Sequence, residues 1–159
     1  RGAFASAFSV KPEIALVLEA TTAADLPGTP SGKRVCAPGK GVVIPYMDGG
    51  TIYDRGLFCR LRELAEANHI PWQTKEYLSG GTNGRTYQRS RAGVRVAGLA
   101  IATRYLHAPT SVAAVADMEG MLELARAFIG PGTRAPSAPP SARQRSLTPM
   151  TSPRTPWAT

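Results

Sequence analysis

One short apolar run, Ile-Ala-Leu-Val-Leu at residues 14–18, restricts the fold of this chain more than any other feature. A run of this length is typical of a strand that is buried on both faces. Glu19 follows directly, and residues 21–28 then favour a turn. Open α/β sheets bind their ligands just outside the carboxyl ends of strands. Glu19 is therefore a candidate metal ligand or general base; the alternative is a solvated residue at a strand end.

Strand-like and helix-like segments alternate along residues 1–130. Asp54 is the expected N-cap of the second helix. The apolar patterns predict strands over residues 14–19, 41–46, 72–78 and 94–102 and helices over residues 1–10, 54–69, 84–91 and 117–129. In the last helix we expect one apolar face made of Met118, Met121, Leu122, Ala125, Phe128 and Ile129. This alternation predicts an α/β sheet with helices on both sides.

Residues 131–159 differ in composition from the rest of the chain. They hold seven of its 14 prolines and four arginines without any acid, and so carry half of the net charge of +8. Such a segment buries too little apolar area to offset the entropy lost on ordering, which predicts a disordered Pro/Arg/Ser-rich tail after a body of residues 1–130. The tail also suggests an alternative function: a basic non-catalytic module that binds nucleic acid or protein through it.

The apolar runs and the cysteines bear on location. No run approaches the ~20 apolar residues of a membrane span, and no leader with a cleavage site is visible. Cys36 and Cys59 are too few for a disulfide scaffold and form no Cys-x-x-Cys pair. We therefore expect no membrane partner, and reduced thiols in the cytoplasm. The chain begins at Arg1 rather than Met, which suggests a piece of a longer protein.

His107 is the second candidate ligand, because it follows the fourth predicted strand as Glu19 follows the first. Imidazole and carboxylate together suit zinc, cobalt or manganese. The alternative is an ordinary loop histidine bonded to a backbone carbonyl. His69 lies at the end of a predicted helix, where it suits the helix dipole better than a metal. Two ligands cannot complete a catalytic metal site, which normally takes three protein ligands and a water.

A Gly-Gly-Thr-Asn sequence at residues 80–83 precedes a predicted short helix. Backbone N–H groups at such a place favour negative charge and suit a carboxylate or a developing oxyanion. No dinucleotide-binding or Walker glycine pattern is present, and no serine lies in a nucleophile elbow. The residues alone therefore predict part of a metal site and no complete active site.

Six short motifs, taken together, resemble one family. The chain is similar, over roughly residues 1–130, to the second half of the glutamyl and tetrahedral aminopeptidases, metallopeptidase family forty-two. The motifs are Leu18-Glu-Ala-Thr-Thr-Ala-Ala-Asp-Leu-Pro-Gly28, Pro38-Gly-Lys-Gly41, Met47-Asp48, Ile70-Pro-Trp-Gln73, Gly80-Gly81-Thr82 and Arg104-Tyr-Leu-His107, in this order.

The resemblance implies a fold, cofactors and partners. It implies a three-layer α/β/α sandwich of the zinc-peptidase type and two divalent metal ions, zinc or cobalt, bridged by one aspartate. Glu19 and His107 match two of the metal ligands, and Gly80, Gly81 and Thr82 match a substrate-binding segment. The implied partners are peptide substrates and, in the intact enzyme, further copies of the chain, with no nucleic acid and no membrane.

The resemblance also implies that this chain lacks parts of the site. Arg1-Gly2-Ala3 matches a triplet that follows the family's paired glutamates, so the general-base glutamate would lie upstream of Arg1. The bridging aspartate and the first histidine are absent as well. Asn83 stands where many relatives have aspartate, which puts any role for a negative charge there in doubt. We therefore expect a fragment of a cytoplasmic metallo-aminopeptidase, a peptide hydrolase, that is inactive by itself.

Overall fold

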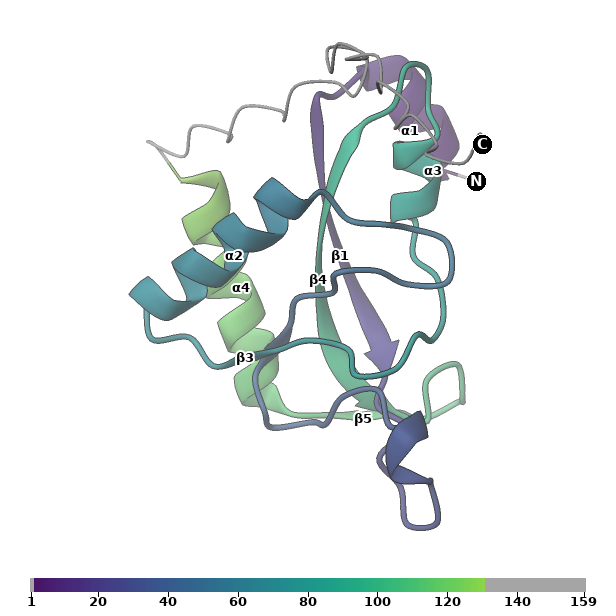
Figure 1. Ribbon diagram of the computed structural model, residues 1–159, viewed down its shortest axis with the longest axis vertical. Coiled ribbons are helices and arrows are strands. Elements are labelled where there is room, and N and C mark those ends of the chain that lie inside the picture. Colours follow the sequence, from purple (N-terminus) through teal and green to yellow (C-terminus); the bar gives the residue numbers. More distant parts are fainter. Residues whose placement is uncertain (1, 131–159) are drawn as a thin grey trace, which may run out of the picture.

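The computed structural model describes residues 2–130 and contains one mixed sheet with helices on both faces (Figure 1). The predicted tail lies outside the described residues. The elements are α1 (Gly2–Val10), β1 (Ile14–Thr22), the 3₁₀ turn η1 (Ser31–Lys33), β2 (Val42–Val43), α2 (Arg55–Ala67), β3 (Trp72–Gln73), α3 (Gly84–Gln88), β4 (Arg95–Arg104), β5 (Val112–Ala113) and α4 (Val115–Ile129). No helix among these is long and apolar enough to cross a bilayer.

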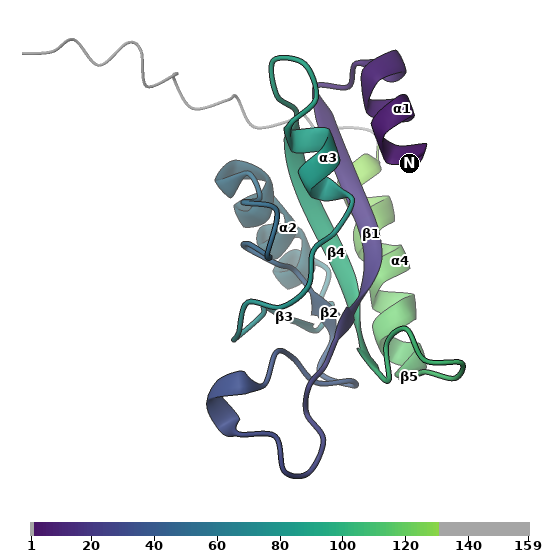
Figure 2. The same ribbon diagram turned by 90° about the vertical axis from the view of Figure 1, so that its right-hand side faces the viewer.

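Two long parallel strands, β1 and β4, form the main part of the sheet. They pair from Ile14–Arg95 to Thr22–Thr103, so their carboxyl ends lie side by side (Figures 1 and 2). The strand order is β1-β4-β2-β3, and β5 pairs with the end of β4. The short strands β2 and β5 run antiparallel to β4, whereas β3 is parallel to β2. The predicted α/β sheet is confirmed, with a mixed rather than fully parallel strand arrangement.

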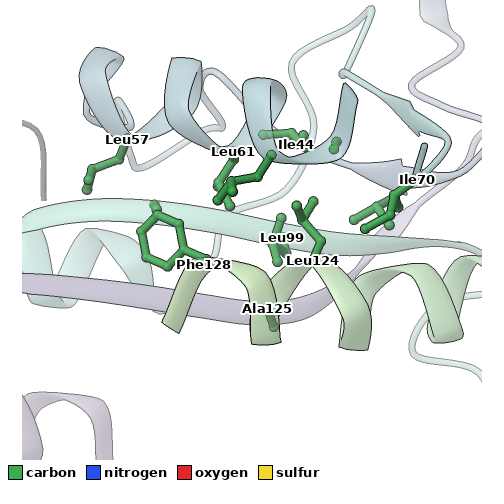
Figure 3. Close-up of a cluster of buried hydrophobic side chains, with 12 residues drawn as sticks. Ile44, Leu57, Leu61, Ile70, Leu99, Leu124, Ala125 and Phe128 are labelled. Atoms are coloured by element: carbon green, nitrogen blue, oxygen red, sulfur yellow. The ribbon is translucent and has the colours of Figure 1, made fainter. Parts of the chain in front are cut away.

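Helices α2 and α4 lie on one face of the sheet and enclose the main apolar core (Figures 1 and 3). Figure 3 shows Leu57 and Leu61 of α2 facing Leu124 and Phe128 of α4, with Leu99 of β4 among them. The other face of β4 packs against Tyr53, Tyr87 and the loop that follows β1. Helices α1 and α3 contact each other, and α3 also contacts β1 and β4. The three-layer prediction is confirmed.

Strand β1 differs from the prediction in length and in burial. It continues to Thr22 because its pairing with β4 continues that far, so Glu19 lies inside the strand and not just after it. Within the described residues β1 has a strand neighbour on one side only. Leu18 is 45% exposed, so the expectation of a strand buried on both faces is wrong at this residue.

Strands β2 and β3 are two residues each, far shorter than the sequence predicts. Pro45 has no N–H group and cannot continue the hydrogen-bond ladder of a strand, which limits β2. Strand β5 was not predicted, because two residues are too few to show any periodicity. The predicted N-cap of α2 is confirmed: the Asp54 carboxylate accepts a hydrogen bond of 3.0 Å from Leu57 N.

Helix α4 buries a different face from the one expected. It begins at Val115, and Asp117 is 1% exposed, with its carboxylate accepting hydrogen bonds from Gly39 N (2.8 Å) and Gly41 N (2.9 Å). These bonds turn the Asp117 side of the helix toward the protein. Leu124, Ala125 and Phe128 are buried on that side, whereas Met118, Leu122 and Ile129 remain exposed. The predicted apolar face is therefore wrong for those three residues.

Candidate functional site

A cavity of about 280 Å³ lies near the carboxyl ends of β1 and β4. It is lined by Glu19, from β1, and by His107, from the turn after β4. The remaining lining residues are Ala20, Thr21, Thr22, Lys75, Ser79, Gly80, Gly81, Thr82 and Leu106. The structure thus brings all five of the site residues predicted from the sequence to one place. Two neighbouring parallel strands bring Glu19 and His107 together, because side chains near their carboxyl ends meet at one end of the sheet, and Gly80, Gly81 and Thr82 come from the segment before α3.

The Glu19 carboxylate is held by the segment of residues 80–83. Its Oε1 atom accepts a hydrogen bond of 2.8 Å from the backbone N–H of Asn83, just before α3. The sequence indicated that this segment suits a carboxylate or a developing oxyanion, and in this structure one of its N–H groups binds the carboxylate of the chain's own Glu19. The contact occupies Oε1 of Glu19, and the Oε2 atom of the carboxylate is left for another interaction.

His107 is presented by a turn with an unusual backbone. Tyr105 and His107 have φ angles of +59° and +67°, in the left-handed region that side chains with a Cβ rarely adopt. Just before them, the Arg104 guanidinium pairs with both carboxylate oxygens of Asp25, at 2.9 and 2.6 Å. This ion pair holds the pKa of the Asp25 carboxyl below its usual value. It also anchors the start of the turn that carries His107 to the cavity.

Beside the cavity lies a polar group that we call the Asp48 cluster: the buried residues Asp48 and Tyr53, and Thr82 from the cavity wall. Asp48 Oδ2 accepts hydrogen bonds from the Tyr53 hydroxyl (2.8 Å) and the Thr82 hydroxyl (3.1 Å), and the two hydroxyls are 2.8 Å apart. Oδ1 accepts from the N–H groups of Gly50 and Thr51, both at 2.8 Å. Burial opposes ionisation of the carboxyl, but these hydrogen bonds outweigh it, and the pKa of Asp48 is lowered.

Sequence reasoning missed two residues near the cavity. The motif Met47-Asp48 was noted only as part of a resemblance, since the partners of Asp48 become visible only in three dimensions. Lys75 lines the cavity, and its Nζ atom donates a hydrogen bond of 3.1 Å to Ser79 O. Burial lowers the pKa of this lysine. A single lysine in a segment predicted to be a strand gives no signal in the sequence.

The donor set is incomplete for a catalytic metal site. Across residues 2–130, no group of three or more His, Cys, Asp or Glu side chains could hold a metal ion. Glu19 and His107 supply a carboxylate and an imidazole to the cavity, whereas His69, at the end of α2, does not line it. The chemistry of this pair fits zinc or cobalt, and a catalytic site built on it would need further ligands from outside residues 2–130.

Comparison with known proteins identifies relatives. A sequence model of the M42 glutamyl aminopeptidases matches residues 1–124. The chain is 32% identical to the lysyl aminopeptidase of Pyrococcus furiosus over 130 residues, which cover 81% of this chain and 36% of that protein. The chain therefore spans little more than a third of the length of this relative.

Solved structures show the same relationship. A TET aminopeptidase from a marine sediment thaumarchaeon superposes with a TM-score of 0.77 at 30% identity, over 81% of this chain and 36% of that one. The TET1 peptidase of Pyrococcus horikoshii, which can assemble into a tetrahedron or a large octahedral shell, superposes with a TM-score of 0.65 at 27% identity, over 80% of this chain and 36% of that one.

Proposed function

Because the chain belongs to the M42 glutamyl aminopeptidase family, we propose that it supplies part of the active site of a metal-dependent aminopeptidase, which removes N-terminal residues from peptides. One observation carries the proposal: Glu19 and His107, 88 positions apart in the sequence by their numbers, line a single cavity at the ends of two parallel strands.

In this proposal Glu19 and His107 each hold one of two divalent ions, zinc or cobalt. Bound divalent ions supply Lewis acidity: they polarise the scissile carbonyl and lower the pKa of a water toward ~7. The residues of this chain orient the two ligands. The Asn83 N–H orients the Glu19 carboxylate, and the Arg104–Asp25 pair anchors the turn of His107.

The wall formed by Gly80, Gly81 and Thr82 is the proposed contact surface for the substrate backbone. Glycine at two successive positions lets a peptide approach the main chain closely. The general-base glutamate and the bridging aspartate would come from the part of the complete protein that this chain does not contain. The one-third coverage of the relatives leaves ample length for those residues.

We further propose that the complete protein is a cytoplasmic homo-oligomer. The described cysteines, Cys36 and Cys59, are both free, as expected in a reducing compartment. Burial raises the pKa of the Cys36 thiol to about 11, which keeps it unreactive. Assembly of the similar TET1 peptidase into closed shells supports an oligomer. The alternative, a basic binding module, rests on residues 131–159, which lie outside the described part of the chain.

The proposal is tested by an aminoacyl-arylamide assay of this chain and of the complete protein, each with added cobalt or zinc. We expect turnover only by the complete protein, and its loss in both Glu19→Gln and His107→Ala. Losing a general base alone typically costs ~10²–10⁴ in rate, so the chain by itself should be inactive. Turnover by the chain alone that His107→Ala abolishes would show a complete site within it. Full activity of both variants in the complete protein would reject the proposed function.

A further inference from the structure

Residues 80–83 connect the Asp48 cluster to Glu19 through two hydrogen bonds. At one point the Thr82 hydroxyl donates to Asp48, and one residue later the Asn83 N–H donates to Glu19. We propose that Asp48 is a positioning residue, which acts through Thr82 and residues 80–83 to hold the Glu19 carboxylate in the orientation that binds a metal ion. This inference rests on the proposed function, since it takes Glu19 to be a metal ligand.

The position of the Asp48 carboxylate is fixed by hydrogen bonds within its own loop. The side chain is 5% exposed, and its Oδ1 atom is held by two N–H groups of the same turn, those of Gly50 and Thr51. The Asp48 N–H donates in turn to Thr51 O at 2.9 Å. Within residues 2–130, four groups donate to the carboxylate, and of these only the Thr82 hydroxyl lies outside residues 48–53. Thr82 is therefore the link between this turn and the cavity wall.

The charge of Asp48 is what holds both hydroxyls. Tyr53 and Thr82 carry one hydroxyl hydrogen each, and an ionised carboxylate only accepts. Hydrogen bonds to an ionised acceptor are roughly twice as strong as those between neutral groups. Because the pKa of Asp48 is lowered, the carboxylate stays ionised at neutral pH. An amide in its place would lose that charge and weaken the hold on Thr82.

A second set of contacts fixes the backbone of residues 80–83 on the same turn. Gly49 N donates to Gly80 O at 2.8 Å, and a Cβ atom at Gly49 would lie only 2.6 Å from that oxygen. Within the segment, Gly84 N donates to the Thr82 hydroxyl at 3.2 Å, which closes a local turn around Asn83. The Asp48 turn therefore contacts the segment at Gly80 and at Thr82, directly before the Asn83 N–H that donates to Glu19.

A carboxylate that is already oriented loses less freedom when it binds a metal ion. Hydrogen-bond partners that orient metal ligands typically change metal affinity or activity by 10–100-fold when they are removed. A purely structural Asp48 would instead affect only the stability of the fold. The two roles therefore differ in a quantity that can be measured apart from activity, the dissociation constant for the metal.

The experiment uses the complete protein, stripped of metal and titrated with cobalt(II) while its visible absorption is recorded. We expect Thr82→Val and Asp48→Asn each to raise the cobalt dissociation constant by ~10–100-fold. Thr82→Ser keeps the hydroxyl and should restore the affinity. The matched control is Asp54→Asn, which removes another hydrogen-bonded carboxylate, the one that caps α2 and pairs with Arg95 at the start of β4. It should lower the melting temperature and leave cobalt affinity unchanged.

The outcomes distinguish the positioning role of Asp48 from the metal-ligand role of Glu19. Wild-type affinity in Thr82→Val and Asp48→Asn, with weakened binding in Glu19→Gln, would overturn the positioning role and leave the proposed function standing. Unchanged affinity in Glu19→Gln would overturn both. If Asp54→Asn loses as much cobalt affinity as Thr82→Val and Asp48→Asn, the loss reflects reduced stability of the fold. That result would also overturn the positioning role. If Asp48→Asn does not fold, the comparison of Thr82→Val with Thr82→Ser decides.

Discussion

Three aspartates, Asp25, Asp48 and Asp54, are ionised inside sets of hydrogen bonds or ion pairs. Arg104 holds the pKa of Asp25 low, and Arg95 does the same for Asp54. At Asp48 the cost of burial is outweighed by four hydrogen bonds. All three groups therefore ionise more easily in the folded chain than in the unfolded one, where the pKa of aspartate is ~3.9.

These shifts predict a loss of stability in acid. Because the folded pKa values are lowered, the stabilisation is complete above about pH 4 and is lost as the pH falls through the folded pKa values. Urea unfolding of the chain should give similar free energies of unfolding at pH 7 and pH 5 and a clearly lower one at pH 3. Asp54→Asn should be less stable at pH 7 and should lose less on acidification. An equal acid loss in this variant would contradict the assignment.

At the level of single residues, the sequence indicates the ligands but not their supports. Glu19 and His107 were found because a polar side chain near the end of an apolar strand is visible in the chain order. Asp48 was not, because its link to the cavity is a hydrogen bond to a hydroxyl 34 positions away. Such a hydrogen bond depends on how two loops pack, and no local pattern in the sequence predicts it.

At the level of elements, helix α2 was predicted well because its information is local. Asp54 is recognisable as an N-cap from its short acidic side chain at the start of the helix, and Leu57, Leu61 and Leu64 lie at the 3.6-residue period and are buried in the structure. Helix α4 has apolar residues over more of its circumference, so the period does not say which face is inside. Asp117 decides it, through hydrogen bonds to a loop 76 and 78 positions earlier.

The buried face of α4 can be tested with two leucines on the same helix. Leu124 is fully buried in the core, whereas Leu122 is 50% exposed. Leu124→Ala should lower the free energy of unfolding of the chain by ~2–5 kcal/mol, because it removes apolar contacts and leaves a cavity. Leu122→Ala should change it by less than ~0.5 kcal/mol. Equal losses in urea unfolding would contradict the observed orientation of the helix.

At the level of the whole molecule, the sheet of the described residues has an unpaired edge at β1. Within the described residues the outer edge of β1 has no strand neighbour, and a hollow of about 500 Å³ runs along it between β1 and α1. Apolar side chains are exposed on the flanking helices, among them Phe4 and Phe8 of α1 and Ile129 of α4. Large exposed apolar areas and free strand edges mark interaction surfaces. We expect the rest of the complete protein to cover this edge.

The chain by itself should therefore self-associate through β1. Light scattering after size-exclusion chromatography should show a mass above that of the 16.8 kDa monomer, and Leu18→Lys should shift it toward the monomer. A charge on a strand edge opposes pairing with a second edge. Leu78→Lys, at a leucine that is 50% exposed in a loop, is the matched control and should leave the mass unchanged. A monomeric wild-type chain would contradict this expectation.

Binding of metal ions by Glu19 and His107 in one cavity is tested most directly by anomalous diffraction from crystals of the complete protein grown with cobalt. We expect two anomalous peaks ~3.5–4 Å apart. One should lie ~2.0–2.2 Å from a Glu19 carboxylate oxygen and the other at that distance from a His107 ring nitrogen, with the two side-chain ends within about 8 Å. Peaks bound by other residues, with Glu19 and His107 making no contact to either ion, would contradict it.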